Sequence, residues 1–146
     1  MNSQEKKHWL SRYQSINRQV KSKLDEIERL RSLETKITPT LSDMPKGGGS
    51  SNKIELVTER IDEIEQQMSD ELKNLVDTRA EIEAVIQQVE SEPYREVLER
   101  RYIHGEHWEQ IAVNMNYDYR WVLRLHGKAL AEINTPQKAT IKSAMM

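Results

Sequence analysis

Residues 107–133 read HWEQIAVNMNYDYRWVLRLHGKALAEI and carry the strongest structural signal in the chain. Apolar residues recur at helical spacing on both sides of a short polar break at Asn116, Tyr117 and Asp118. Asn tolerates the left-handed backbone that a tight turn between helices commonly needs, and Asp is a good N-cap for a following helix. The pattern therefore predicts helices at about 107–115 and 118–133, joined by a three-residue turn.

The second of these helices divides into two faces at 3.6 residues per turn. The row formed by Arg120, Arg124 and Lys128 is predicted to point outward, with Tyr119, Leu123 and Gly127 beside it; the inward face comprises Val122, Leu125, Ala129, Leu130 and Ile133. A helix that reads the major groove of DNA needs such an outer face, because its first side chains reach base edges and later cations neutralise phosphates. Basic helix faces also occur in proteins that bind nothing acidic. The short preceding helix, the turn and the cap together favour binding of double-stranded DNA.

A third helix is predicted directly before this pair. Pro93 suits a first helical turn, and Gly105 ends the segment. Apolar side chains on one face of this helix can cover the pair: Tyr94, Val97, Leu98 and Tyr102. The short helix is expected to turn Trp108, Ile111, Ala112 and Met115 inward.

The first 92 residues carry two narrow apolar stripes at helical spacing. One comprises Trp9, Tyr13, Ile16, Val20, Leu24, Ile27 and Leu30; the other comprises Ile54, Val57, Ile61, Ile64, Met68, Leu72, Leu75, Ile82, Ile86 and Val89, with Arg79 where an apolar residue was due. Between them, Pro39, Pro45 and three consecutive glycines predict a linker at about 38–53, so that the first helix ends near Ile37.

The two stripes differ strongly in charge. Residues 1–37 carry nine basic against five acidic groups, +4, whereas residues 54–92 carry three against twelve, −9. Pairing the stripes would bury both and bring opposite charges together, which predicts a long antiparallel helical hairpin, a coiled-coil-like arm. Pairing of each helix with its own copy, in a homo-oligomer formed through the arm, stays open.

The predicted fold is thus all-α, with three segments: a helical arm at 1–92, a DNA-binding helix-turn-helix bundle at 93–135 and a flexible tail at 136–146. Composition agrees, since 32% of the 146 residues are charged and Phe is absent, as is typical of long solvated helices. Cysteine is also absent, which excludes disulfides and thiolate chemistry. No apolar run is long enough for a signal peptide or a membrane span, so a cytoplasmic protein without a membrane partner is expected.

No residue pattern predicts catalysis. His104 and His107 straddle Gly105 without a third ligand at suitable spacing, and the many Glu residues of 55–92 form a solvated helix face. The three glycines lack the Lys and Ser or Thr of a phosphate-binding loop. We therefore expect no enzyme, no metal site and no cofactor.

The segment RYIHGEHWEQIAVNMNYDYRWVLRLHGKALAEI resembles region 4 of sigma-70 type RNA polymerase subunits, and more closely the phage ArpU and RinA type late-transcription regulators. The similarity covers about residues 93–133, and the segment SDMPKGGG also resembles a segment of those phage proteins. In such a unit the positions of Tyr119, Arg120, Trp121, Arg124 and Lys128 face the major groove. Two departures are His107, where the pattern favours a Ser or Thr cap, and Asn116, where sigma factors favour Gly.

The resemblance implies a sequence-specific transcription regulator of a phage or prophage, a late-gene activator type acting in the bacterial host cytoplasm. Its arm would hold a partner, either a second copy or RNA polymerase. Two other functions fit the same pattern. One is a DNA-packaging recognition subunit of a phage, and the other is a coiled-coil adaptor that binds no DNA.

Overall fold

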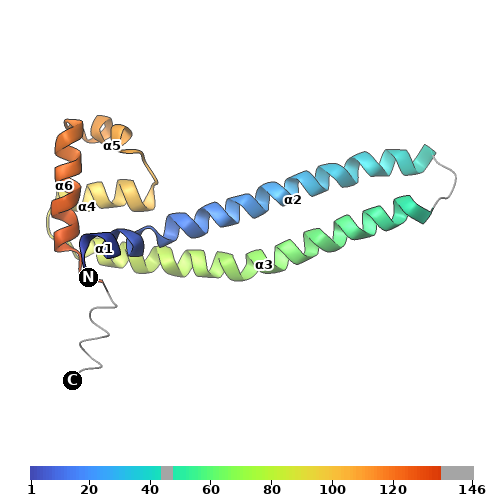
Figure 1. Ribbon diagram of the computed structural model, residues 1–146, viewed down its shortest axis with the longest axis horizontal. Helices are drawn as coiled ribbons and strands as arrows, with labels where there is room; N and C mark the ends of the chain where they lie inside the picture. Colours follow the sequence, from blue (N-terminus) through green and yellow to red (C-terminus); the bar gives the residue numbers. More distant parts are fainter. Residues whose placement is uncertain (44–47, 136–146) are drawn as a thin grey trace, which may run out of the picture. The chain divides into compact units, whose positions relative to one another are not determined.

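The structure, a computed structural model, describes the backbone of residues 1–43 and 48–135 and the side chains of residues 1–36 and 52–135. The fold is all-helical, and the described residues contain no strand. In chain order (Figure 1) the helices are α1 (Ser3–Leu10), α2 (Arg12–Asp43), α3 (Gly48–Gln87), α4 (Glu92–Leu98), the π-helix η1 (Glu99–Ile103), α5 (Trp108–Met115) and α6 (Tyr119–Glu132). The tail predicted at 136–146 lies outside the described residues.

Two compact units divide the chain. One spans Ile16–Asn74, and the other joins Met1–Ser15 to the part of the chain from Leu75 onward. The N-terminal helix and the end of α3 therefore belong with the C-terminal helices. Each unit has buried apolar residues of its own.

In the unit Ile16–Asn74, α2 and α3 lie side by side and run in opposite directions (Figure 1). The apolar seam between them is narrow and contains Val20, Ile27, Ile61, Ile64 and Met68. Ion pairs connect the two helices along this seam: Lys23 with Glu71, Arg31 with Glu65 at 2.7 Å, and Arg60 with Glu26 at 3.6 Å. Oppositely charged side chains therefore accompany the buried stripe, as the difference in charge between the two segments predicts.

The linker predicted at 38–53 is wrong for most of its length. The backbone is helical as far as Asp43 and again from Gly48, so the first helix continues past Ile37 and Pro39. Intrinsic propensity is a weak guide where helices pair, because tertiary packing supplies most of the stability of a helix. The pairing reaches close to this end, where the hydroxyl of Thr58 donates to Glu34 at 2.8 Å.

The unit formed by Met1–Ser15 and the described residues from Leu75 onward has one apolar core. Trp9, Leu10 and Tyr13 contribute to it from the N-terminal side, so the start of the first apolar stripe is buried in this core. The other members come from α3 to Ile133: Ile82, Val85, Ile86, Val89, Val97, Leu98, Tyr102, Ile103, Ile111, Ala112, Val122, Leu125, Ala129, Leu130 and Ile133. The predicted inner faces of the helices from Pro93 onward therefore meet in this core.

Helix α1 is a separate short helix that the sequence pattern did not separate from α2. Asn2 and Glu5 form a reciprocal capping box at its start, and the helix ends at Leu10, with Ser11 as its C-cap. The break at Ser11 allows α1 to contact α6, where the Lys6 ammonium group donates to the backbone carbonyl of Leu130 at 2.9 Å.

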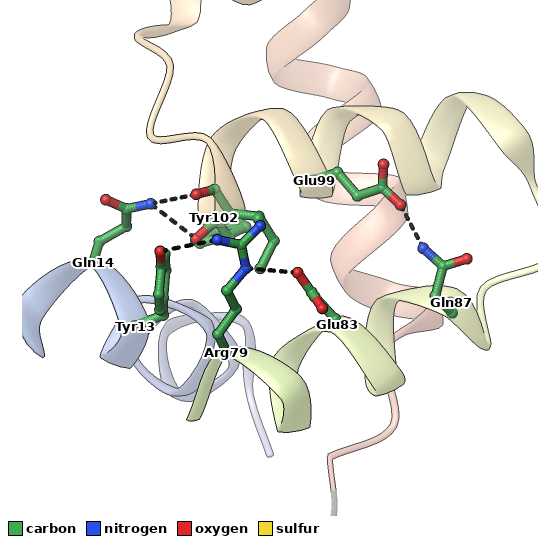
Figure 2. A network of polar contacts seen from close by, with 8 residues as sticks. Tyr13, Gln14, Arg79, Glu83, Gln87, Glu99 and Tyr102 are labelled. Carbon is green, nitrogen blue, oxygen red and sulfur yellow. Dashed lines mark hydrogen bonds and ion pairs between the residues drawn. The ribbon is translucent and has the colours of Figure 1, made fainter. Parts of the chain in front are cut away.

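Polar contacts join the start of α2, the end of α3 and η1 (Figure 2). The Arg79 guanidinium donates to Glu83 at 2.7 Å and to the Tyr13 hydroxyl at 3.4 Å. Arg79 thus lies beside the core, and Thr78 takes the buried seam position instead. The Gln14 amide donates to the carbonyls of Tyr102 and Ile103 at the end of η1, at 3.1 and 3.0 Å.

Candidate nucleic-acid interface

The turn between α5 and α6 has the backbone that the sequence predicts. Asn116 adopts the left-handed conformation with φ 59° and ψ 42°, and the N–H of Tyr117 donates to the carbonyl of Ala112 at 3.0 Å. The Asp118 carboxylate accepts a hydrogen bond from the N–H of Arg120 at 3.2 Å, so the predicted N-cap is also confirmed. His107 makes no side-chain capping bond at the start of α5, which agrees with its departure from the Ser or Thr pattern.

Helix α6 has one buried and one exposed side. The predicted inward residues are all buried: Val122, Leu125, Ala129, Leu130 and Ile133. The five predicted site residues are all exposed: Tyr119, Arg120, Trp121, Arg124 and Lys128. Successive residues of an α-helix differ by about 100° around the axis. Arg120 and Arg124 therefore lie near the middle of the exposed side, and Tyr119 and Trp121 lie at its two edges.

The cations on this side lack anionic partners. Arg120 and Arg124 form no side-chain hydrogen bond or ion pair with any described residue. The Lys128 ammonium group lies 4.9 Å from the centre of the Trp121 ring, which is a cation–π distance. Gly127 faces open space, since a side chain at that position would meet nothing within 4 Å.

Some of the other arginines resemble Arg120 and Arg124, since Arg18 and Arg29 on α2 are also exposed and form no ion pair with a described residue. Five others pair with carboxylates within 4 Å: Arg12, Arg31, Arg60, Arg79 and Arg100. Arg100, for example, contacts both Glu96 and Glu106 and has a raised pKa, for which hydrogen bonds to these two carboxylates more than offset burial. The outer side of α6 therefore carries positive charge that the fold leaves uncompensated.

His126 is a buried polar residue of α6 that the sequence interpretation missed. It lies on α6 with 5% of its surface exposed, and its Nε2 is 2.7 Å from the Tyr102 hydroxyl oxygen. Its ring meets the Trp108 ring edge-on, with centres 4.6 Å apart. Burial, followed by the nearby charges of Lys7 and Arg101, lowers the pKa of His126 to about 4. The spacing of four from Val122 and Leu130 could have placed it on the inward face.

Comparison of the chain with protein-family models, curated proteins and solved structures finds no match. Within the described residues, no cluster of three or more His, Asp or Glu side chains could hold a metal ion. No helix in that part of the chain has an apolar stretch long enough to cross a membrane.

Proposed function

We propose that this chain is a sequence-specific double-stranded DNA-binding transcription regulator of the phage late-gene activator type. In this proposal α5 and α6 form a helix-turn-helix of the sigma-70 region 4 kind, and α6 enters the major groove. The pair α2 and α3 acts as an antiparallel coiled-coil-like arm that holds a second copy or RNA polymerase. The protein would then work in the cytoplasm of a bacterial host.

The observation that carries the proposal is the uncompensated positive charge of α6. Arg120 and Arg124 are exposed and unpaired, whereas the side chains opposite them are buried in the core. Phosphate groups of DNA supply the missing anions, and release of their counterions drives association. The row favours a polyanionic partner in combination with the turn at Asn116 and the N-cap at Asp118, because together they give the helix pair of a groove-reading unit.

In this proposal the exposed residues have different tasks. Tyr119 and Arg120 lie in the first turn, next to the cap at Asp118, and a recognition helix uses its N-terminal side chains to contact base edges. Arg124 lies one turn further along the same side and can reach bases or phosphates. Lys128 lies in the next turn and suits a backbone phosphate, because an ammonium group acts as a point charge without a planar fork. The open space at Gly127 admits a close approach of the DNA backbone.

Transcription, among DNA-dependent functions, is favoured by the resemblance of residues 93–133 to sigma-70 region 4 and to ArpU and RinA type regulators. Sigma region 4 units act beside RNA polymerase, so the arm would provide the contact or dimerisation surface that a short DNA-binding unit lacks. A packaging subunit would instead assemble into rings, and an adaptor would lack salt-dependent affinity for DNA.

Selection of bound sequences from a random double-stranded DNA pool tests the proposal at fixed salt. The chain is compared with a variant in which Arg120, Arg124 and Lys128 are all Ala. A matched control replaces three exposed cations of α2, Arg18, Lys21 and Arg29, by Ala, so that the net charge changes equally. We expect one enriched motif for the wild type and the control, and none for the α6 variant.

If the α6 variant also enriched the motif, the row on α6 would not be the surface that reads the sequence. If none of the proteins enriched a motif, the adaptor function would be favoured. Equal loss in both triple variants would indicate an effect of net charge alone. Only a loss confined to the α6 variant supports a sequence reader on this helix.

A further inference from the structure

A pocket of about 400 Å³ opens in the unit formed by the two chain ends. It is bounded by α1 and its end, by η1, by the first residue of α5 and by α6. Its lining residues are Lys7, Ser11, Arg101, Tyr102, Trp108, Leu123 and His126. None of the lining side chains is a carboxylate. Leu123 places the pocket next to the exposed side of α6, since this leucine is 39% exposed and also lines the cavity.

Two cations line the pocket without an anionic partner. Lys7 is half-buried and makes no ion pair with a described residue. Arg101 is held in place, because its guanidinium donates to the carbonyl of Glu106 at 3.1 Å and lies 4.3 Å from the centre of the Trp108 ring. A fixed guanidinium and a free ammonium group that line one pocket, with no carboxylate in its lining, form an arrangement that attracts an anion.

The remaining polar groups suit an oxyanion. The Ser11 hydroxyl lines the pocket as a potential donor. The Tyr102 hydroxyl shares a 2.7 Å hydrogen bond with His126 Nε2, so it can donate to an anion when the neutral His126 ring carries its proton on Nε2. His126 stays neutral near pH 7, because burial and then the charges of Lys7 and Arg101 lower its pKa to about 4. These two cations thus already act on the pocket electrostatically. An anion between them would weaken their effect on His126.

We propose that the pocket formed by Lys7, Arg101, Ser11 and Tyr102 binds a phosphate oxyanion. The phosphate can come from free inorganic phosphate or from the backbone of DNA that lies on α6. The second source rests on the proposed function, whereas the first does not depend on it. In either case Lys7, on α1, supplies a positive charge to the pocket, although it lies 94 residues before Arg101 in the sequence.

The test begins with inorganic phosphate and no DNA. Phosphate replaces chloride at constant ionic strength, while NMR follows the Trp108 indole N–H and the His126 ring. We expect saturable shifts in the wild type and affinity lower by roughly tenfold in Lys7→Gln, from the loss of one charge-assisted contact. Lys21→Gln, which removes an equal charge from an exposed site on α2, should bind phosphate as the wild type does. An unchanged Trp108 indole signal in phosphate-free Lys7→Gln would show that the pocket is intact, whereas the His126 ring is expected to respond to the loss of the Lys7 charge.

The second arm measures affinity for double-stranded DNA against salt. If the DNA backbone supplies the phosphate, Lys7→Gln should make the slope of log affinity against log salt shallower by about one unit. If free phosphate is the ligand, the slope stays unchanged and only the phosphate titration differs. The proposal is overturned if the wild type shows no saturable shift and Lys7→Gln also leaves the DNA slope unchanged. A wild type that binds phosphate in the pocket but no DNA would refute the DNA-binding proposal alone.

Discussion

The hydroxyl oxygen of Tyr102 lies 2.7 Å from Nε2 of His126, and each side chain has 5% of its surface exposed. This contact joins η1 to α6 inside the core, 24 residues apart in the sequence. Burial raises the pKa of Tyr102 to about 12, and it lowers that of His126 together with the charges of Lys7 and Arg101. Both groups are therefore neutral near pH 7, which leaves one hydrogen bond and no buried charge.

The depressed pKa of His126 predicts a loss of stability in acid. Unfolding returns its pKa from about 4 to the ordinary 6.5, so the unfolded chain binds a proton that the folded chain does not. As the pH is lowered from 6.5 to about 4, the free energy of unfolding should decrease, by up to about 3 kcal/mol in total. Urea denaturation at a series of pH values measures this change.

The matched control is His126→Gln, which keeps a polar side chain and removes the titration. The difference in unfolding free energy between wild type and variant should shrink between pH 6.5 and about 4. Carboxylates titrate in both proteins and cancel in that difference. A constant difference across this range would show that His126 does not titrate with a depressed pKa.

Asn116 should be replaceable by Gly but not by Ala. Its φ of 59° lies in the left-handed region, which costs a residue with a Cβ about 1 to 2 kcal/mol unless a short polar side chain or Gly occupies it. We expect Asn116→Ala to lower the free energy of unfolding by about 1 kcal/mol and Asn116→Gly to change it by less. Chemical denaturation of the three proteins measures the order, and an Ala variant as stable as the wild type would contradict it.

Replacing Lys23 or Glu71 alone should lower the stability of the chain more than replacing both. Their side chains are 24% and 25% exposed, and one Glu71 carboxylate oxygen is buried without a hydrogen-bond partner. Lys23→Met should destabilise the chain by about 1 to 3 kcal/mol, because it leaves this carboxylate partly buried and unpaired. The double variant Lys23→Met with Glu71→Met should recover most of the loss.

Thermal and urea unfolding of the two single variants and the double variant gives the coupling between the residues. Additive losses would show that the ion pair contributes nothing beyond its separate members. Sedimentation of the double variant tests a second effect, since an uninterrupted apolar seam permits self-association that a polar pair opposes.

Single substitutions on α6 should separate phosphate contact from base reading. Lys128→Ala should make the salt dependence of DNA affinity shallower by about one unit while the preferred sequence stays the same. Arg120→Ala or Arg124→Ala should instead cost about 1 to 3 kcal/mol of binding free energy and relax base preference at one position. Titrations of the selected DNA site and of single-base variants at several salt concentrations measure both effects. A uniform loss on all sequences for every variant would assign the whole row to phosphates.

Local signals in the sequence predicted the turn and the N-cap between the last two helices. The preference of Asn116 for a left-handed backbone and of Asp118 for an N-cap acts over a few residues, as does the end of the third helix at Gly105, where φ is 69°. Helical periodicity likewise separated the buried side of α6 from the row of Arg120, Arg124 and Lys128. These features depend on neighbours within two helical turns, so a single sequence reports them.

Local composition gave a wrong prediction where the pairing of α2 with α3 stabilises the helices. Pro39 and the glycines predicted a linker, whereas α2 continues to Asp43 and α3 begins at Gly48. The stripe that contains Trp9 also gave no sign of the break at Ser11, where α1 turns so that Lys6 contacts α6. A proline inside a helix costs about 3 kcal/mol, so packing along the helix pair has to outweigh the local preference at Pro39.

The sequence by itself therefore determined the helical class, the turn at Asn116 and the charged outer row of α6, because each follows from spacing along one helix or from one residue's backbone preference. Only the tertiary structure decided which residues, distant in the sequence, lie together in the same buried environment. It buried His126 against Tyr102 and brought Lys7 to the same pocket as Arg101. Such contacts join segments far apart in the chain, and their burial and charge exist only once those segments have packed.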